Sequence, residues 1–337
     1  MSSAPPFTIT PALLGQVAEI AGELGRLGAL EGIGQVPRLR RENRIRSIHA
    51  SLAIEQNTLS LEQMTAVIAG QRVLGAPREI REVRNAFTAY EAMGGWKPWS
   101  LKDLLAAHRL LLDGLAEDAG KLRTRGVGVA KGGVLVHLAP PAAGVAGLMR
   151  DLLGWLKKTD VHPLVAGSVC HYELEFIHPF SDGNGRIGRL WQTLILSRWD
   201  PLLGFLPVES VVRERQDEYY RILAVCDKAG NSTAFIEFML GALLAALRDA
   251  RRTDQVGDQV SDQVSEQVSE QVKGLLGCLV DGPRSARECM DRLGLCHRPT
   301  FRANYLNPAL AAGLIELTVP DKPRSRLQQY RLARNRT

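Results

Sequence analysis

The sequence predicts a mainly α-helical protein with one short β-hairpin in its larger part and a smaller helical domain at its carboxyl end. Three observations support this prediction. Apolar residues recur at intervals of three and four through most of the first 250 residues, valines alternate around a pair of glycines, and a four-residue repeat separates the two parts. With 337 residues, the chain is long enough for about two domains of roughly 150 residues each.

Helical periodicity is clearest in five segments that precede the repeat. We expect helices over residues 11–27, 45–54, 101–115, 145–156 and 235–247. Two more apolar helices should flank residues 178–189, one containing Val165, Val169 and Tyr172, and the other beginning near Ile187. In residues 127–138, valines on both sides of two glycines predict a short hairpin, and an irregular loop is the alternative.

The repeat over residues 254–272 reads DQVGDQVSDQVSEQVSEQV and contains five acidic residues and no basic ones. Valine and serine are weak helix formers, so we expect an acidic, solvated linker over residues 251–273. The alternative is a helix on which the valines form a winding apolar stripe that associates with a second chain.

Beyond the repeat, the order of elements is typical of a winged helix-turn-helix domain over residues 274–337. We expect helices at 285–293, 297–306 and 308–312, then strands at 314–318 and 330–332 that are joined by a loop rich in Pro and Arg. The net charge of +6 is uneven, because residues 273–337 hold 12 Lys and Arg against 5 Asp and Glu.

Composition excludes several classes of protein. The longest apolar run, residues 238–247, is about half the length that crosses a bilayer, and no secretory signal is visible, so we expect a cytoplasmic protein without membrane contact. The five cysteines show no disulfide pattern and should be buried as small apolar residues. Cys289, Cys296 and His297 have no fourth ligand nearby, so a zinc site is not expected.

The chemistry is concentrated in residues 178–189, which read HPFSDGNGRIGR between two predicted helices. Gly183 and Gly185 allow backbone conformations that point amide N–H groups at one spot near a helix start, an arrangement that favours phosphate. Arg186 and Arg189 lie three residues apart, so both can reach phosphate oxygens from one face of the first helical turn.

Two further side chains of the same segment suit catalysis on a phosphate ester. His178 has an ordinary pKa near neutrality and can take a proton from a hydroxyl nucleophile. Asp182 offers the oxygen ligand that Mg²⁺ prefers when it binds through one carboxylate and substrate phosphates, and Phe180 should anchor the loop in the core. The segment therefore predicts a nucleotidyl- or phosphoryl-transfer site.

This segment resembles the Fic family (filamentation induced by cyclic AMP), because it matches the motif HPFx[D/E]GNGRxxR at every specified position. The resemblance covers roughly residues 38–226. It implies a Fic (Fido) core over residues 101–250, with the hairpin at 126–138 as a flap that holds a target segment as an added strand. It also implies transfer of AMP from ATP to a Ser, Thr or Tyr hydroxyl of a target protein or of the enzyme itself, with release of pyrophosphate.

The resemblance assigns roles to individual residues of the site. His178 would be the general base, and Asp182 would hold Mg²⁺ at the α- and β-phosphates. An anion cradle would form from Gly183, Asn184 and Gly185, with Arg186 and Arg189 on the outer phosphates. Tyr219 and Tyr220 stand where the family often lines the nucleotide base pocket, although tyrosines at helical spacing also suit a core.

A second motif, SLAIEQN at residues 51–57, resembles the Fic inhibitory helix [S/T]xxxE[G/N] within an N-terminal helical region over residues 1–100. The resemblance implies that Glu55, in the motif that begins at Ser51, pairs with Arg189 and blocks a productive γ-phosphate position. Gln56 departs from the family, which prefers Gly or Asn there. Relatives with this helix often dimerise, and removal of AMP by the same site and use of another nucleotide donor remain alternatives.

The carboxyl-terminal domain supports a different hypothesis, a DNA-binding regulator in which the Fic fold senses a nucleotide. Arg298 and Arg302 lie four residues apart on the candidate recognition helix, and Arg324 and Arg326 lie in the predicted wing. A solvated basic face, or a docking surface for a protein, is the alternative interpretation of these four arginines.

Overall fold

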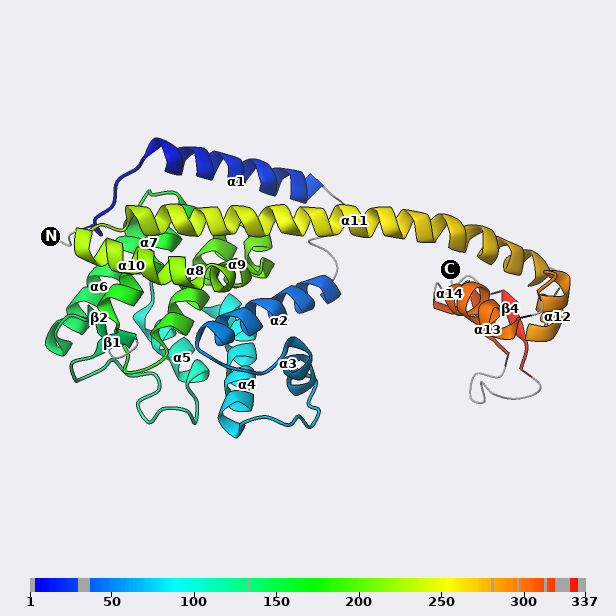
Figure 1. Cartoon of the computed structure of the whole chain (residues 1–337), viewed down its shortest axis with the longest axis horizontal. Helices are drawn as coiled ribbons and strands as arrows, with labels where there is room; N and C mark the ends of the chain where they lie inside the picture. Colours follow the sequence, from blue (N-terminus) through cyan, green and yellow to red (C-terminus); the bar gives the residue numbers. More distant parts are fainter. Residues whose placement is uncertain are drawn as a thin grey trace. The chain divides into compact units, whose positions relative to one another are not determined.

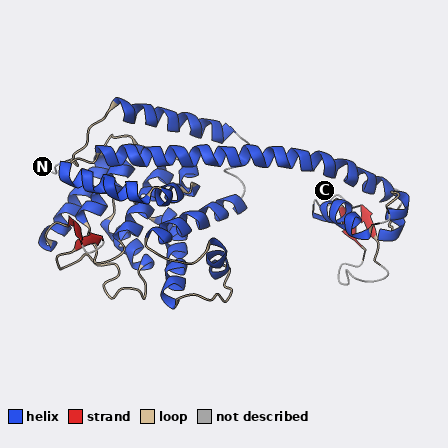
Figure 2. Cartoon of the chain, viewed as in Figure 1, coloured by secondary structure: helices blue, strands red, loops and turns tan. Residues whose placement is uncertain are grey.

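The computed structural model describes residues 4–29, 37–131, 134–279, 282–295, 297–311, 314–318 and 328–332. Two compact units divide the chain, Met1–Arg251 and Arg252–Thr337. Helices make up most of both units (Figures 1 and 2), as the sequence predicts. Within the described residues, none of the helices combines the length and the apolar character that crossing a bilayer requires.

The first unit is a helical bundle with one hairpin. Its helices are α1 (Pro11–Ala29), α2 (Pro37–Ile54), α3 (Leu61–Ile68), α4 (Pro77–Ala92), α5 (Leu101–Leu111), α6 (Ala142–Lys158), α7 (Pro163–Ile177), α8 (Asn184–Trp199), α9 (Val208–Glu214), α10 (Gln216–Ala229) and the first part of α11 (Thr233–Leu279). Short 3₁₀ turns lie at η1 (Met93–Gly95) and η2 (Pro201–Phe205).

The predicted hairpin is confirmed as β1 (Gly128–Lys131) and β2 (Val134–Leu138), an antiparallel pair in which Gly128 faces Leu138 and Lys131 faces Val134. The register shifts between Val129 and Ala130. The expected helix at 101–115 ends earlier, at Leu111, and Gly114 then adopts a φ of 63° that continues the chain as a turn.

Helices α7 and α8 lie at the centre of the first unit (Figure 1). Every residue of α7 from Leu164 to Tyr172 is buried, so this part of the helix is covered on all sides instead of having one solvent-exposed face. The largest apolar core joins α7 and α8 to α2–α6, and Trp191, fully buried on α8, stacks on Trp96 in that core. The loop that joins α7 to α8 is therefore fixed at both ends by buried helices.

Helix α1 packs along the first part of α11, with Leu13, Ile20 and Leu243 in a shared apolar core. Polar contacts reinforce this packing: the Thr10 hydroxyl donates to Glu237 Oε1 over 2.7 Å, and Arg248 pairs with Glu19. The extended segment before α1 is held in the same way, because Ser232 N donates to Pro6 O over 2.9 Å.

The second unit has its own small core, in which Leu275, Cys289, Phe301, Leu306 and Ile315 are buried. Its described elements are α12 (Ala286–Arg292), α13 (Arg298–Phe301), a π-helical turn η3 (Arg302–Leu306), α14 (Asn307–Ala311), β3 (Ile315–Leu317) and β4 (Tyr330–Leu332). The strands pair antiparallel, with Glu316 opposite Arg331. This order agrees with the predicted elements, while the winged-helix assignment itself stays a prediction.

The repeat at residues 254–272 is helical and belongs to α11, which continues to Leu279. The low helix propensity of valine and serine therefore does not keep this segment from being helical, and its role as an acidic linker stays a prediction. Extending an existing helix avoids the cost of nucleation, and glutamine and glutamate, which occur in the repeat, are good helix formers. The predicted wing, with Arg324 and Arg326, and Cys296 lie outside the described residues, whereas the other four cysteines are free and buried.

Candidate active site

The loop between α7 and α8 turns sharply because two residues adopt left-handed backbone conformations. His178, which ends α7, has a φ of 48°, and Gly183, which precedes α8, has a φ of 80°. A Cβ at Gly183 would lie 2.6 Å from Leu112 Cδ2, so both the conformation and the space require glycine there. The glycine that the sequence suggested for an anion cradle thus also sets the angle at which α8 begins.

Phe180 and Asn184 hold the loop in this shape. Phe180 is fully buried, as expected of an anchor, and its ring stacks on His108 with centroids 3.7 Å apart. The Asn184 side chain accepts from Phe180 N and donates to Phe180 O, each over 2.9 Å. The side chain of Asn184 therefore binds the loop itself.

His108, which the sequence analysis did not single out, fixes the other side of the loop. Its Nδ1 accepts from Gly120 N over 2.9 Å, so the hydrogen is on Nε2, which donates to Asp182 O over 2.9 Å. Burial lowers the pKa of His108, which keeps the ring neutral and this pair of hydrogen bonds intact.

The His178 ring is oriented by its own helix. Nδ1 lies 3.3 Å from the backbone oxygen of Glu175, and because a carbonyl only accepts, Nδ1 holds the hydrogen of the neutral ring. Nε2 is then the basic nitrogen. His178 lines the large cavity of the first unit, so the side chain is placed to take a proton from a group bound there.

Arg189 contacts the end of α2, as the second motif predicts. Nη2 donates to Glu55 Oε1 over 2.8 Å and to Ser51 O over 3.1 Å, and Nε donates to the Ser51 hydroxyl over 2.9 Å. Burial alone would lower the pKa of this nearly buried guanidinium, but the Glu55 carboxylate outweighs it and raises the pKa. A Cβ on Gly185 would lie 2.6 Å from Glu55 Oε1, so this glycine leaves room for the carboxylate.

Gln56 explains why the family prefers glycine or asparagine after the glutamate. Its φ is 68°, a left-handed conformation that glycine and asparagine adopt at lower cost than glutamine. Helix α2 nevertheless ends as the motif requires, and Gln216 Nε2 of α10 donates to Ile54 O over 3.1 Å. With Gln56 in this conformation, Glu55 still reaches Arg189.

Arg186 and Asp182 bind each other and two side chains of α4. Arg186 Nη2 donates to Asp182 Oδ1 over 3.0 Å, and Nη1 lies 3.6 Å from Glu82 Oε1. Asp182 Oδ1 also accepts from Gly183 N over 2.6 Å, and its Oδ2 lies 3.5 Å from Arg78 Nη2. Arg186 is only 6% exposed and does not line the large cavity, whereas Asp182 does.

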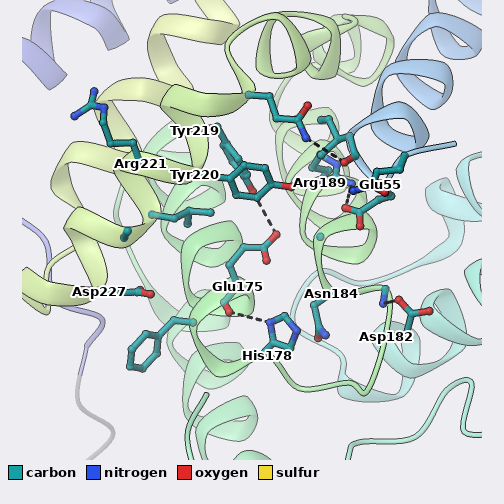
Figure 3. A pocket seen from close by; sticks show the side chains of 18 of the residues that line it. Glu55, Glu175, His178, Asp182, Asn184, Arg189, Tyr219, Tyr220, Arg221 and Asp227 are labelled. Atoms are coloured by element: carbon teal, nitrogen blue, oxygen red, sulfur yellow. Dashed lines mark hydrogen bonds and ion pairs between the residues drawn. The ribbon is translucent and has the colours of Figure 1, made fainter. Parts of the chain in front are cut away.

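The large cavity has a volume of about 790 Å³, which suits a nucleotide-sized ligand. Figure 3 shows the residues from α7, α8 and α10 that surround it, with Asp182 and Asn184 at one end and Asp227 at the other. The lining includes these predicted site residues: Glu55, His178, Asp182, Gly183, Asn184, Gly185, Arg189, Tyr219 and Tyr220. Arg298 and Arg302 belong to the second unit, where both are exposed.

Glu175 is a lining residue that the sequence analysis missed. Its Oε1 accepts from the Tyr219 hydroxyl over 3.3 Å and lies 3.6 Å from His171 Nε2. Burial would raise the pKa of this carboxyl, but His171, with Arg189, lowers the pKa below its ordinary value. Tyr219 has the features of both a pocket residue and a core residue, because it lines the cavity and its fully buried ring packs on Phe235.

Asp227 and Arg221 line the cavity at the end opposite the loop. Asp227 accepts from the Tyr172 hydroxyl over 3.0 Å, and Tyr220 lines the same cavity. Burial and then the charge of Asp227 raise the pKa of nearby Glu173 to about 7. A ligand group that meets Asp227 must donate a hydrogen bond, because an ionised carboxylate only accepts.

Two family models match the chain. Residues 98–196 match the Fic/DOC family, and residues 270–333 match the C-terminal domain described as filamentation induced by cAMP protein Fic-like. Both matches fall on the segments that the sequence motif and the element order single out.

The chain is also similar to named proteins. The protein adenylyltransferase fic-1 of Caenorhabditis briggsae is 33% identical over 215 residues, and that of Caenorhabditis elegans is 32% identical over 215 residues. Each match covers 60% of this chain and 40% of the relative, so the chain spans about 40% of the length of these curated relatives.

Solved structures give a longer match. A Fic family protein from Desulfovibrio desulfuricans G20 is 56% identical, with a TM-score of 0.75 over 99% of this chain and 100% of that one. A fragment of Fic-1 from Caenorhabditis elegans has a TM-score of 0.60 at 24% identity, over 73% of this chain and 72% of that one, which is a likeness of fold alone.

Proposed function

The chain belongs to the Fic family, and we propose that it is a protein adenylyltransferase, which transfers AMP from ATP to a hydroxyl side chain of a target protein or of itself. The observation that best supports this proposal is one cavity of about 790 Å³ that is lined by a basic imidazole, a carboxylate, a helix start and a buried arginine. The names of the curated relatives add support at the level of the family.

The proposed step balances with the groups at hand. His178 Nε2 takes the proton of the target hydroxyl while the hydroxyl oxygen forms a bond to the α-phosphorus of ATP. The bond from the α-phosphorus to the oxygen bridging to the β-phosphate breaks, and its electron pair leaves with pyrophosphate. The products are pyrophosphate and a phosphodiester that joins AMP to the target oxygen.

The lining residues fit the two ends of ATP. The first N–H groups of α8, after Gly183, have no partners within the helix and suit the phosphates, together with Arg189. At the other end, Tyr220 and Asp227 suit an adenine, whose exocyclic amino group is a donor that a carboxylate can accept.

The family implies Mg²⁺, and the Asp182 carboxylate fits it. Asp182 lines the cavity with a side chain that is 44% exposed, beside the helix start proposed for the phosphates. Mg²⁺ commonly binds through one or two carboxylates and completes its shell with phosphate oxygens and water. When bound, it would neutralise charge on the α- and β-phosphates.

We also propose that Glu55 inhibits this activity. A phosphate that binds Arg189 Nη2 would compete with Glu55, because carboxylate and phosphate accept from the same N–H groups of a guanidinium. Removal of AMP through a water that Glu55 positions is the alternative role of the same carboxylate.

The target segment is proposed to add to the hairpin. A two-stranded sheet presents unpaired backbone groups at its edges, so an extended segment can bind there as a further strand. In this mode, main-chain hydrogen bonds hold the target segment, and the side chains of that segment determine which target is selected.

A second candidate function, DNA binding, is favoured by the exposure of Arg298 and Arg302 in the second unit. Phosphate contacts by such residues weaken steeply with salt. Retention of the whole chain on a DNA column should therefore fall as salt rises, and removal of both arginines by R298A and R302A should lower the salt slope by about 2.

The donor and the reaction are tested together in the Glu55→Gly variant, by incubation with ATP and Mg²⁺ and measurement of the intact mass. A gain of one AMP supports the proposal. Label from α-labelled ATP alone indicates adenylylation, and label from γ-labelled ATP would instead indicate phosphorylation. His178→Ala should abolish the gain, and its persistence there would contradict the role of His178 as the base.

A further inference from the structure

Arg123 is a buried cation that binds the protein backbone. Only 4% of the residue is exposed, and burial lowers the pKa of its guanidinium. Within the described residues, every acceptor recorded for the guanidinium is a backbone carbonyl oxygen. A side chain that is costly to bury is thus used to fix four points of the main chain.

Two of these carbonyls belong to the base of the hairpin. Nη1 donates to Arg125 O over 2.8 Å, and Nη2 donates to Pro140 O over 2.5 Å. Arg125 precedes β1 and Pro140 follows β2, so one guanidinium ties both stems of the hairpin. The stems are also paired by Ala139 N, which donates to Val127 O over 3.3 Å.

The other two carbonyls belong to the end of α7. Nε donates to His178 O over 2.7 Å, and Nη2 also contacts Ile177 O at 3.3 Å. The backbone of Arg123 adds a further bond, from its N–H to Pro179 O over 2.9 Å. These bonds hold His178 in its left-handed conformation, which a residue with a side chain keeps only when its surroundings fix it.

We propose that Arg123 is a positioning residue, which fixes the backbone of His178 relative to the hairpin so that a hydroxyl presented on the hairpin reaches His178 Nε2. This inference rests on the proposed transfer of AMP to a segment bound at the hairpin. The five N–H groups of arginine lie in one rigid fork, so no other side chain can bind four carbonyls in this arrangement.

The first test compares Arg123→Gln and Arg123→Lys in the Glu55→Gly background, with labelled ATP as the donor and the chain itself as acceptor. Misplacement of the reacting groups by about 1 Å can reduce a rate by about 100-fold, so kcat should fall by about that factor in Arg123→Gln. The KM for ATP should stay within about threefold, because Arg123 does not line the cavity. Arg123→Lys keeps the charge and should give an intermediate kcat.

Arg198→Gln is the matched control. Arg198 Nη2 also donates to backbone carbonyls, those of Gly94 and Trp96, over 2.7 and 2.8 Å, and neither residue belongs to the loop or the hairpin. Arg198 is exposed whereas Arg123 is buried, so both variants are compared at a temperature well below the Tm of each, where a loss of stability alone leaves kcat unchanged. An unchanged kcat in Arg123→Gln, or an equal fall in the control, would overturn the proposal.

A second measurement does not depend on transfer. Hydrogen exchange of peptides covering residues 124–140 and 174–180 should quicken together in Arg123→Gln and stay unchanged in Arg198→Gln. If the parent variant Glu55→Gly shows no transfer at all, the proposed function fails. The hydrogen-exchange measurement still decides the role of Arg123 in that case. Unchanged exchange in both peptides would overturn the coupling between the hairpin and His178.

Discussion

Removal of the Glu55 carboxylate tests directly whether Arg189 is held away from phosphate. Glu55 follows Ile54, the last residue of α2, so replacement by glycine removes the side chain without placing a glycine inside the helix. Glu55→Gln is the graded partner of this variant, because it keeps the size and an acceptor oxygen but removes the charge.

The contact geometry sets the expected magnitude. Glu55 accepts from Arg189 over 2.8 Å, and a hydrogen bond between charged groups contributes about 1.5–3 kcal/mol. The Glu55 side chain is 32% exposed, so water screens the pair and the lower part of that range, about 1.5–2 kcal/mol, applies. At 1.4 kcal/mol for each factor of ten, Glu55→Gly should speed self-modification by about 10- to 30-fold, and Glu55→Gln by less.

The assay is the initial rate of label incorporation from α-labelled ATP at a concentration below the KM. Glu62→Gln controls for the loss of one negative charge, because Glu62 lies nearby in sequence on α3 and its carboxylate accepts from the Ser60 hydroxyl instead of from an arginine. Rates within about twofold across wild type, Glu55→Gly and Glu62→Gln would refute the inhibitory role.

Three further predictions concern stability. Gln56→Gly relieves the left-handed φ of 68° and should raise the free energy of unfolding in urea by about 0.5–1 kcal/mol; a decrease would contradict this account of the strain. Burial and Asp227 raise the pKa of Glu173 to about 7, above its value in the unfolded chain, so the free energy of unfolding falls as pH rises toward 7. Glu173→Gln should therefore have a higher Tm than wild type at about pH 8 and lose this advantage at about pH 5. Burial lowers the pKa of His108, so the stability that the neutral ring contributes is complete above the unfolded pKa of about 6.5 and is lost on acidification. The difference in Tm between wild type and His108→Phe should therefore shrink as pH falls. A difference that stays constant with pH would contradict this account of His108.

Local patterns predicted the parts of the fold that depend on neighbouring residues. The apolar spacing of residues 11–27 marks α1, and alternating valines around glycine mark the hairpin, because both signals lie within one element. Helix α2 begins at Pro37, well before the predicted start at residue 45. The apolar spacing did not reveal its first turns, because these are rich in arginine and show no apolar face. The helical state of the repeat was not predicted for a related reason, because the helix propensities of single residues take no account of a helix that is already formed on one side.

Site residues outside the motifs could not be found from the sequence. Arg123 acts on carbonyls up to 55 positions away, and His108 binds Asp182 O across 74 positions. Neither residue stands in a pattern that separates it from an ordinary helix or loop residue. Glu175 had one local signal, since it lies in a mostly apolar helical segment, three residues before His178. A polar residue on an apolar helix beside a catalytic motif deserves the same scrutiny as the motif.

The charges around the cavity explain why one arginine matters so much. Acidic lining residues outnumber basic ones by five to two: Glu55, Glu175, Asp182, Asp217 and Asp227 against Arg189 and Arg221. A triphosphate that enters this lining is repelled unless cations accompany or meet it. Arg186 lies outside the lining and binds Asp182, whereas Arg189 lies in the lining beside the helix start. Since Glu55 occupies that arginine, the proposed inhibition should act on how the triphosphate binds.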